Sequence, residues 1–294
     1  MTTAAPAFDP SAVPVQRAAT VLLVDDRPEL EVLCLRRRAG STFVGGMTVF
    51  PGGGIDDHDG DPAYETRVVG RGQADAAQRL ETPDALAYWV AVARETLEEA
   101  GVLLACDAHG HPCAPEVAVR HRHDVDRGHR TLLEVLDEES LCIDAHAVYD
   151  IGRWITPVGP PRRYDTRFFV AQMPPGQEAI VDEVEAVHGE WRRPVDALAE
   201  WRTGGLVMLP PTVAWLRVLE RYRCAEEVLA AARASSGPGL SPRVMGDDRG
   251  SFRVVLPDEV GWHEPDAREA LAWVYEGVLR APGWNTTRES EEQC

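Results

Sequence analysis

The chain has 294 residues, a length that suits one elaborated domain better than two independent cores. Its hydrophobic content of 44% and charged content of 27% are typical of a soluble globular protein. The net charge of −18 argues against a protein that coats a nucleic acid polymer, because no basic field exists to release counterions. A small phosphorylated ligand remains compatible with this charge, because a bound cation inverts the local field.

Residues 1–16 are small and proline-rich, without a basic start or an apolar core, and they predict a flexible tail rather than a signal peptide. No apolar run approaches the length of a membrane span. The six cysteines form no C-x-x-C pair and fit reduced thiols. We therefore expect a cytoplasmic protein with no membrane partner.

Two apolar runs in residues 18–36 flank the segment D-D-R-P-E-L and predict a β-hairpin. The hairpin ends in three arginines, of which Arg36 is a candidate to reach a substrate phosphate, although surface charge is the alternative reading. A second apolar strand in residues 48–56 runs into Pro51 and three glycines, where backbone can approach a ligand closely.

Residues 57–81 are polar and acidic with scattered glycine, and they predict a surface loop with one helical turn around residues 74–80. A helix should follow, starting near Thr82, which is a capping residue before Pro83, and ending at Gly101. At about 100° per residue, one face of this helix is an apolar stripe. The stripe consists of Leu86, Val90, Ala93 and Leu97.

The opposite face of the same helix carries Glu95, Glu98 and Glu99 at spacings i, i+3 and i+4. Three like charges there repel one another, so the arrangement suits a site where a cation neutralises them. Mg²⁺ or Mn²⁺ fits, because these hard ions take oxygen ligands and keep waters for a phosphate substrate. Arg94 can orient one carboxylate with its planar fork. A solvated acidic face is the alternative.

The succession of strand, glycine turn and R-E-x-x-E-E-x-G resembles the Nudix hydrolases, whose box reads G-x5-E-x7-R-E-U-x-E-E-x-G-U, with U an aliphatic residue. The second half of the box matches position by position, with Thr96 in place of an aliphatic residue. Gly53 would be the box glycine, about 27 residues further from Arg94 than the pattern expects. The glutamate of the first half is absent, and Asp56 or Asp57 are candidates to replace it.

Further motifs resemble the Nudix branch with an expanded box that includes the peroxisomal acyl-coenzyme A diphosphatases. They are W-I-T-P, P-R-R-Y-D-T-R-F-F, D-E-V-E and L-P-P-T, at residues 154–157, 161–169, 182–185 and 209–212. The resemblance implies an α/β/α sandwich with a mixed sheet and metal-dependent hydrolysis of a diphosphate in a nucleoside-diphosphate derivative such as coenzyme A or an acyl-coenzyme A. The metal ligands would be Glu95, Glu98, Glu99 and the carbonyl of Gly53.

Several roles remain open at this point. Glu98 and Glu99 are the main catalytic candidates with Arg94, and the resemblance adds Glu185 as a further ligand or base. Alternation in Y-D-T-R-F-F places Arg163 and Arg167 on one strand face, where either could bind substrate. A ligand sensor that does not hydrolyse, or a diphosphate isomerase, are the alternative functions.

The rest of the chain predicts supporting structure. Residues 106–123 are rich in histidine and cysteine, but the spacings do not match a structural zinc site, so a surface loop is expected. Helices are expected in residues 129–143, 211–234 and 265–280, strands in 148–156 and 164–171, and a short hairpin around residues 244–256. The expected division is a tail at 1–16, a Nudix domain at 17–220 and a C-terminal extension, largely helical, at 221–294. A homodimer is among the assemblies that the sequence leaves open.

Overall fold

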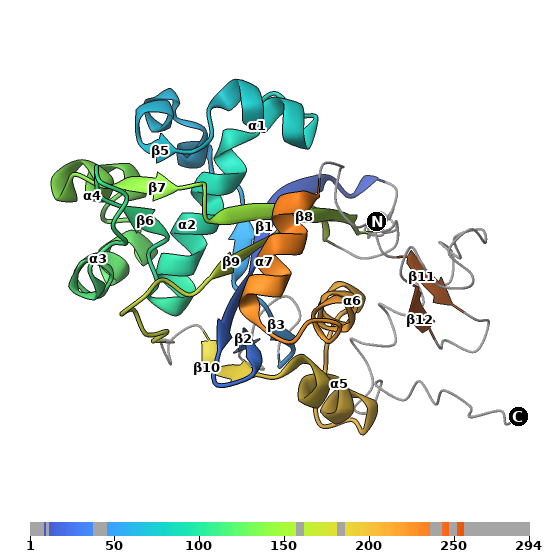
Figure 1. The fold of residues 1–294 in the computed structure, drawn as a ribbon. Coiled ribbons are helices and arrows are strands. Elements are labelled where there is room, and N and C mark those ends of the chain that lie inside the picture. Colours follow the sequence, from blue (N-terminus) through green and yellow to red (C-terminus); the bar gives the residue numbers. More distant parts are fainter. Residues whose placement is uncertain are drawn as a thin grey trace, which may run out of the picture.

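A computed structural model describes residue 9 and residues 12–37, 46–156, 162–180, 186–235, 243–246 and 252–255. Its centre is a mixed sheet in the order β10-β2-β1-β9-β8, with β3 beside β2 and β4 beside β1 (Figure 1). Strands β1 and β9 are parallel, and the other neighbours are antiparallel. The strands are β1 Val15–Asp26, β2 Leu30–Arg37, β3 Thr48–Val49, β4 Gly52–Gly54, β8 Val148–Ile155, β9 Arg163–Gln172 and β10 Ala186–Arg192.

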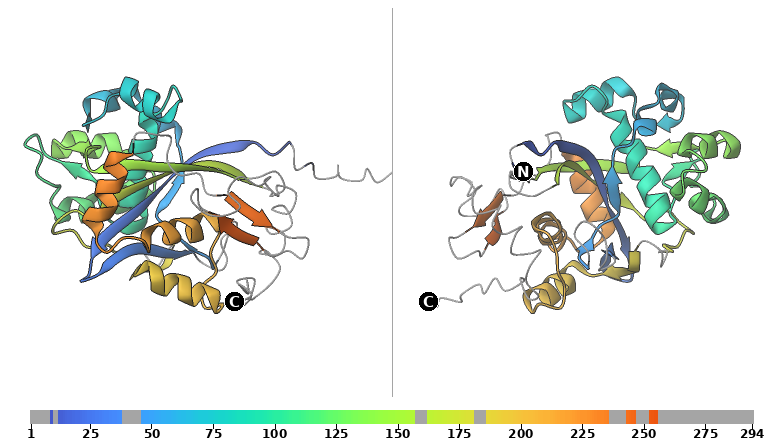
Figure 2. Two further views of the ribbon diagram at one scale, coloured as in Figure 1. Left: turned by 45° about the vertical axis from the view of Figure 1, so that its right-hand side comes forward. Right: turned by 180° about the vertical axis from the view of Figure 1, so that it is seen from behind.

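Helices cover both faces of this sheet (Figure 2). One layer contains α1 Gln73–Leu80, α2 Leu86–Ala100, α3 Pro115–Asp126 and α4 Leu132–Glu139, and the other contains α5 Pro194–Arg202, α6 Pro210–Leu219 and α7 Ala225–Ala234. Successive residues of β1 point to opposite layers, so Val21 and Leu23 pack with α2 whereas Leu22 and Val24 pack with α6 and α7. This arrangement confirms the predicted α/β/α sandwich.

The segment 57–81 is not the surface loop that its composition suggests. It contains the short 3₁₀ helices η2 Asp57–Gly60 and η3 Pro62–Thr66, then β5 Val68–Val69 and α1. Strand β5 joins a small sheet with β6 Ala105–Cys106 and β7 Cys142–Asp144. The helical turn predicted around residues 74–80 is present as α1. The surface-loop prediction for the rest was wrong because a few apolar side chains spaced among polar ones are enough to anchor the segment in the core. Those buried side chains are Tyr64, Val68, Ala76 and Leu80.

Three helix boundaries also differ from the prediction. Helix α2 begins at Leu86, not near Thr82, because its first N–H donates to the side chain of Gln73 at 3.1 Å. The helix expected in residues 129–143 spans only Leu132–Glu139, since Ser140 is left-handed and the chain then enters β7. The single helix expected in residues 211–234 is two helices, and the N-terminus of α7 is capped by Asp26, whose carboxylate accepts from Ala225 N at 2.8 Å.

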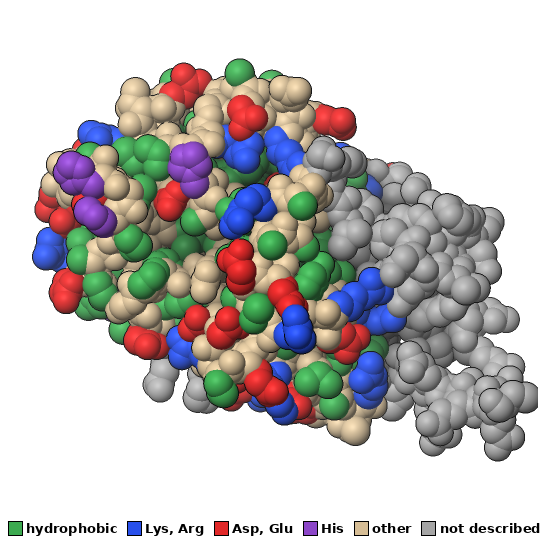
Figure 3. Space-filling view, viewed as in Figure 1, with side chains coloured by type: hydrophobic (Ala, Val, Ile, Leu, Met, Phe, Trp, Pro, Cys, Tyr) green, Lys and Arg blue, Asp and Glu red, His purple; other side chains and the backbone are tan. Residues whose placement is uncertain are grey.

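The hairpin predicted near residue 250 is present as β11 Arg243–Gly246 paired with β12 Phe252–Val255. The helix predicted in residues 265–280 lies outside the described residues. Within the described part of the chain, no helix has both the length and the apolar character that crossing a membrane requires. Acidic and basic side chains are interspersed over the face drawn in Figure 3.

Candidate active site

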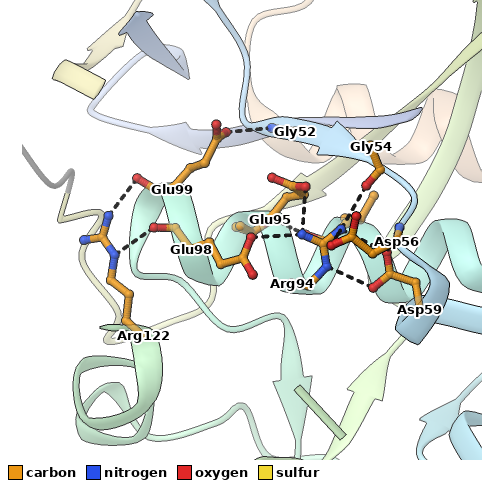
Figure 4. Close-up of polar contacts among 11 residues, drawn as sticks. Gly52, Gly54, Asp56, Asp59, Arg94, Glu95, Glu98, Glu99 and Arg122 are labelled. Carbon is orange, nitrogen blue, oxygen red and sulfur yellow. Dashed lines mark hydrogen bonds and ion pairs between the residues drawn. The ribbon is translucent and has the colours of Figure 1, made fainter. Parts of the chain in front are cut away.

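Helix α2 presents the predicted carboxylates from its last turns (Figure 4). Its side chains are buried on almost every side, including the whole predicted apolar stripe, and even Glu95 is only 9% exposed. The helix ends at Gly101, which has a φ of 65° and donates to the carbonyl of Leu97 at 3.0 Å. The face opposite the stripe is therefore largely covered by protein, and Glu98 and Glu99 on it are half-buried.

Arg122 of α3 caps the C-terminal end of α2. Its guanidinium donates to the carbonyls of Glu98 at 2.9 Å and Glu99 at 3.0 Å, which have no partner within the helix (Figure 4). It also donates to the carbonyl of Ile180. One buried cation thus fixes the end of the helix at the two residues that the sequence identified as catalytic candidates.

Arg94 holds the carboxylates of α2 in place. Its Nη1 donates to Glu95 at 2.8 Å and to Glu98 at 2.9 Å (Figure 4). Its Nε and Nη2 both donate to Asp59 at 2.9 Å, and Nη2 also donates to the carbonyl of Gly54 at 2.9 Å. The planar guanidinium therefore fixes the carboxylates of Glu95 and Glu98 and is itself anchored to the β4 backbone. The sequence predicted that Arg94 would orient one of these carboxylates.

Asp59 was missed by sequence reasoning, which considered Asp56 and Asp57 instead. Asp57 is exposed, and Asp56 lies 3.8 Å from Arg94 with most of its side chain in solvent. Asp59 is 2% exposed because η2 turns it inward, where it also accepts from Asp56 N at 2.8 Å. The i, i+3 spacing of Asp56 and Asp59 is typical of a capping box, and this pattern in the sequence could have indicated that Asp59 turns back toward the chain.

The three glycines of β4 allow this strand to lie directly against α2. The backbone N–H of Gly52 donates to Glu99 Oε2 at 2.8 Å. Gly52 has a φ of 151°, and a Cβ there would overlap the carbonyl of Ala19. At Gly53, a Cβ would occupy the space of the Glu95 carboxylate. The glycine turn thus serves a close approach between backbone and carboxylates, as the sequence indicated.

Glu95, Glu99 and the β4 glycines face a pocket of about 380 Å³, a size that holds a small-molecule ligand. The pocket lies over one end of the sheet, between the strands and the start of α6. Its other lining residues are Ala18, Thr20, Val49, Phe50, Trp154, Thr156, Arg162, Tyr164, Thr166, Phe168, Leu209, Pro211 and Thr212. Glu98 does not line the pocket and instead points toward Arg94.

Arg94 does not neutralise all of the acid charge around it. Burial, opposed by Arg94, raises the pKa of Glu98 to about 7, and burial also raises the pKa of Glu95. The cluster offers carboxylate and carbonyl oxygens but neither sulfur nor imidazole ligands. An additional hard cation such as Mg²⁺ or Mn²⁺ therefore fits the residues present.

The family model described as the NUDT19 Nudix domain matches residues 62–219, more than half of the chain. This chain belongs to the NUDT19 Nudix family. Its sequence is 26% identical over 219 residues to the acyl-coenzyme A diphosphatase NUDT19 of Xenopus laevis, and that match covers 62% of this chain and 58% of the relative. Identity to the Homo sapiens protein of the same name is 23% over 310 residues, covering 87% of this chain and 83% of that protein.

Solved structures agree with the Nudix assignment. A NUDIX hydrolase from Alicyclobacillus acidocaldarius is 28% identical, with a TM-score of 0.62, and the match covers 74% of this chain and 97% of that one. Together with the family match, this confirms the predicted Nudix fold. The matched part of the chain spans only 58% of the length of the Xenopus relative.

The three substrate-binding arginines predicted for this Nudix domain do not meet at the pocket. Arg36 is exposed on β2 and is not among the lining residues. Arg163 donates from Nε to the carbonyl of Thr156 at 3.1 Å, and Arg167 is buried and donates to the carbonyl of Leu80. Arg163 and Arg167 do share one face of β9, as alternation predicted, but the other face of that strand lines the pocket.

Glu185 lies outside the described residues, so its catalytic role stays a prediction. The described chain before the gap, at Ile180, lies against the end of the Nudix helix α2. Ile180 N donates to the carbonyl of Ala100 at 2.8 Å, and the Ile180 carbonyl accepts from Arg122.

A second acidic group lies on α3 and α4 and involves the histidine-rich segment. This α3–α4 cluster consists of His121, Glu138 and Glu139, whose potential ligand atoms lie within 4.8 Å of one another. Arg130 donates to His121 Nδ1 at 3.1 Å and forms an ion pair with Glu138. Of residues 106–123, predicted to be a surface loop, residues 107–114 do form a loop, whereas residues 115–123 belong to helix α3, which is how His121 becomes buried.

Proposed function

We propose that this protein is a metal-dependent diphosphatase that hydrolyses the diphosphate linkage of coenzyme A or an acyl-coenzyme A. The observation that carries the proposal is the pocket in which Glu95 and Glu99 of the Nudix helix lie beside the β4 glycines. The names of the relatives, acyl-coenzyme A diphosphatases, supply the substrate class. The cytoplasmic location expected from the sequence belongs to this proposal, and a homodimer stays among the assemblies that are open.

Glu95, Glu99 and the Gly53 carbonyl would hold the metal at the pocket. Glu98, which Arg94 holds outside the pocket lining at 2.9 Å, would complete the oxygen ligands by turning from Arg94 toward the metal. When bound, Mg²⁺ or Mn²⁺ supplies charge neutralisation for the diphosphate and lowers the pKa of a bound water. The protein contributes rigid placement, because Arg94 fixes the carboxylates of Glu95 and Glu98 and the Gly52 N–H fixes that of Glu99, through hydrogen bonds of 2.8–2.9 Å.

Hydrolysis breaks one P–O bond of the diphosphate and adds the oxygen of a water molecule to the phosphorus that loses its bridge. The bridging oxygen leaves with the other phosphate, so coenzyme A would give 4′-phosphopantetheine and 3′,5′-ADP. The aromatic side chains of Phe50, Trp154, Tyr164 and Phe168 line the pocket and offer surfaces for the adenine base.

The test is incubation of the protein and Mg²⁺ with coenzyme A esters, dinucleotides and nucleotide sugars, followed by mass spectrometry of the products. We expect coenzyme A or an acyl ester to be cleaved to the two products above. Efficient cleavage of a nucleotide sugar or NADH with none of coenzyme A would contradict the substrate assignment. Turnover of no diphosphate would favour a ligand sensor, and a product of unchanged mass would favour an isomerase.

A further inference from the structure

Arg162 differs from the other arginines near β9. Among the described residues that line the pocket, it is the only lysine or arginine. Its side chain is exposed, and within the described part of the chain it takes part in neither an ion pair nor a side-chain hydrogen bond. Most neighbouring cations are engaged, since Arg153 pairs with Asp165 and Arg167 donates to Leu80. A free guanidinium at the mouth of a pocket is available to a ligand.

The register of the sheet places Arg162 away from the carboxylates. Gly54 of β4 pairs with Ala18 of β1, which pairs with Thr166 of β9. The step from β4 across β1 to β9 covers about 10 Å, since neighbouring strands lie about 5 Å apart. Arg162 comes four residues before Thr166 along the chain, and every two residues of a strand span about 7 Å, so its backbone lies well beyond Thr166. Because Arg162 and the carboxylates line the same pocket from these separate positions, they can bracket a ligand about as long as a nucleoside.

The residues between these two ends suit a nucleoside. Tyr164, Thr166 and Phe168 alternate along the face of β9 that carries Arg162, and Trp154 lies opposite Thr166 on β8. Aromatic faces stack on a base without needing a particular hydrogen-bond pattern. A ligand with its diphosphate at Glu95 and Glu99 would therefore present its ribose and base toward Arg162.

We infer that Arg162 binds the 3′-phosphate on the ribose of coenzyme A and makes the pocket prefer substrates that carry this phosphate. This inference rests on the proposed function and names the group that would decide specificity. A guanidinium binds a phosphate through two parallel hydrogen bonds, which a ribose hydroxyl cannot replace. The positive charge also offsets part of the repulsion between an anionic ligand and the carboxylates at the other end of the pocket.

The experiment compares Arg162→Ala with Arg163→Ala, which removes the same charge one position later on the opposite face of the strand. Calorimetry measures the binding of 3′,5′-ADP and of 5′-AMP in the presence of Mg²⁺. We expect the unmodified protein and Arg163→Ala to bind 3′,5′-ADP about tenfold more tightly than 5′-AMP. Arg162→Ala should bind the two ligands within about twofold of each other, with its affinity for 5′-AMP unchanged.

Binding of 3′,5′-ADP no tighter than that of 5′-AMP, or equal loss in both variants, would overturn the inference. Turnover of coenzyme A and dephospho-coenzyme A separates this failure from a failure of the proposed function. If coenzyme A is cleaved but its preference over dephospho-coenzyme A survives in Arg162→Ala, the inference alone fails. If neither is cleaved while other diphosphates are, the proposed substrate fails, and the calorimetric comparison still decides the role of Arg162.

Discussion

Two clusters of acidic side chains in this molecule look alike in composition but have different surroundings. On α2, one arginine serves the carboxylates Asp59, Glu95 and Glu98, while Glu99 accepts from a backbone N–H at the pocket. The α3–α4 cluster has two arginines, Arg120 and Arg130, for its two carboxylates. The first cluster has excess negative charge beside a pocket, whereas the second is already neutral.

The histidine of the α3–α4 cluster has no lone pair left for a metal. Because an arginine only donates, Nδ1 of His121 accepts from Arg130, and Nε2 then carries the proton that it donates to Glu139 at 2.7 Å. Proximity of ligand atoms is therefore a poor guide to a metal site. The ratio of carboxylates to cations and the access from a pocket distinguish the two clusters.

The largest expected effect is on turnover by Glu98→Gln and Glu99→Gln. Each change removes a charge but keeps the shape and helical propensity of the side chain, so the fold should survive. Activity should fall by about two orders of magnitude or more, because a lost ligand weakens the metal and its hold on the phosphate. Steady-state kinetics at saturating Mg²⁺ and thermal melting in EDTA measure the two effects. Glu138→Gln and Glu139→Gln are the matched controls and should keep normal turnover.

A methyl group on β4 should be the next most damaging change. Gly53→Ala would push its Cβ into the Glu95 carboxylate and displace a proposed ligand, and we expect activity to fall about tenfold or more. The control is Gly54→Ala, whose Cβ would meet nothing closer than the Arg17 carbonyl at 3.9 Å. Equal activity of both variants, with unchanged circular dichroism spectra, would show that Glu95 need not lie against Gly53.

The two clusters should also differ in their contribution to stability. Arg94→Lys keeps the charge but cannot reach Asp59, Glu95 and Glu98 together, and it should cost about 3 kcal/mol in the free energy of unfolding. Arg120→Lys changes an exposed pair and should cost less than about 1 kcal/mol. Urea denaturation measures both. Similar losses would mean that burial does not distinguish the clusters.

The smallest effect is expected for Glu139→Gln. The hydrogen bond from His121 lowers the pKa of Glu139 below its usual value of 4.5. Because the folded pKa is depressed, the stabilisation is present above pH 4.5 and is lost as the pH falls through the folded pKa. At pH 7 the variant should therefore be less stable than the unmodified protein by no more than about 1 kcal/mol in the free energy of unfolding, and this difference should shrink as the pH falls below 4.5. A difference that grows on acidification would contradict this assignment.

The sequence predicted what depends on local spacing. The i, i+3, i+4 pattern identified Glu95, Glu98 and Glu99. Aromatic and β-branched content identified β8 and β9, and alternation placed Arg163 and Arg167 on one face of β9. The alternation of side chains along β9 shows which residues share a face of the strand, but it does not show which face lines the pocket. The candidates were therefore Arg163 and Arg167, although among the described residues Arg162 is the arginine that lines the pocket.

Features that depend on distant contacts were not predictable from local patterns. Asp59 becomes a partner of Arg94 only because the segment before α1 folds back over α2. The break between α6 and α7 is stabilised by Asp26, which lies 199 positions before Ala225. Helix propensity alone favoured one continuous helix there. The hydrogen bond from Ala225 to the distant Asp26 instead caps a second helix, so the segment forms α6 and α7.

The most direct test of the account is the binding of Mn²⁺, followed by electron paramagnetic resonance of the free ion in protein titrations. The unmodified protein and Glu139→Gln should bind Mn²⁺ with the same affinity, and Glu99→Gln should bind it at least about tenfold more weakly. That result would place the cation on the Nudix helix. Unchanged binding in Glu99→Gln, or a loss confined to Glu139→Gln, would contradict the central claim that the α2 carboxylates form the metal site.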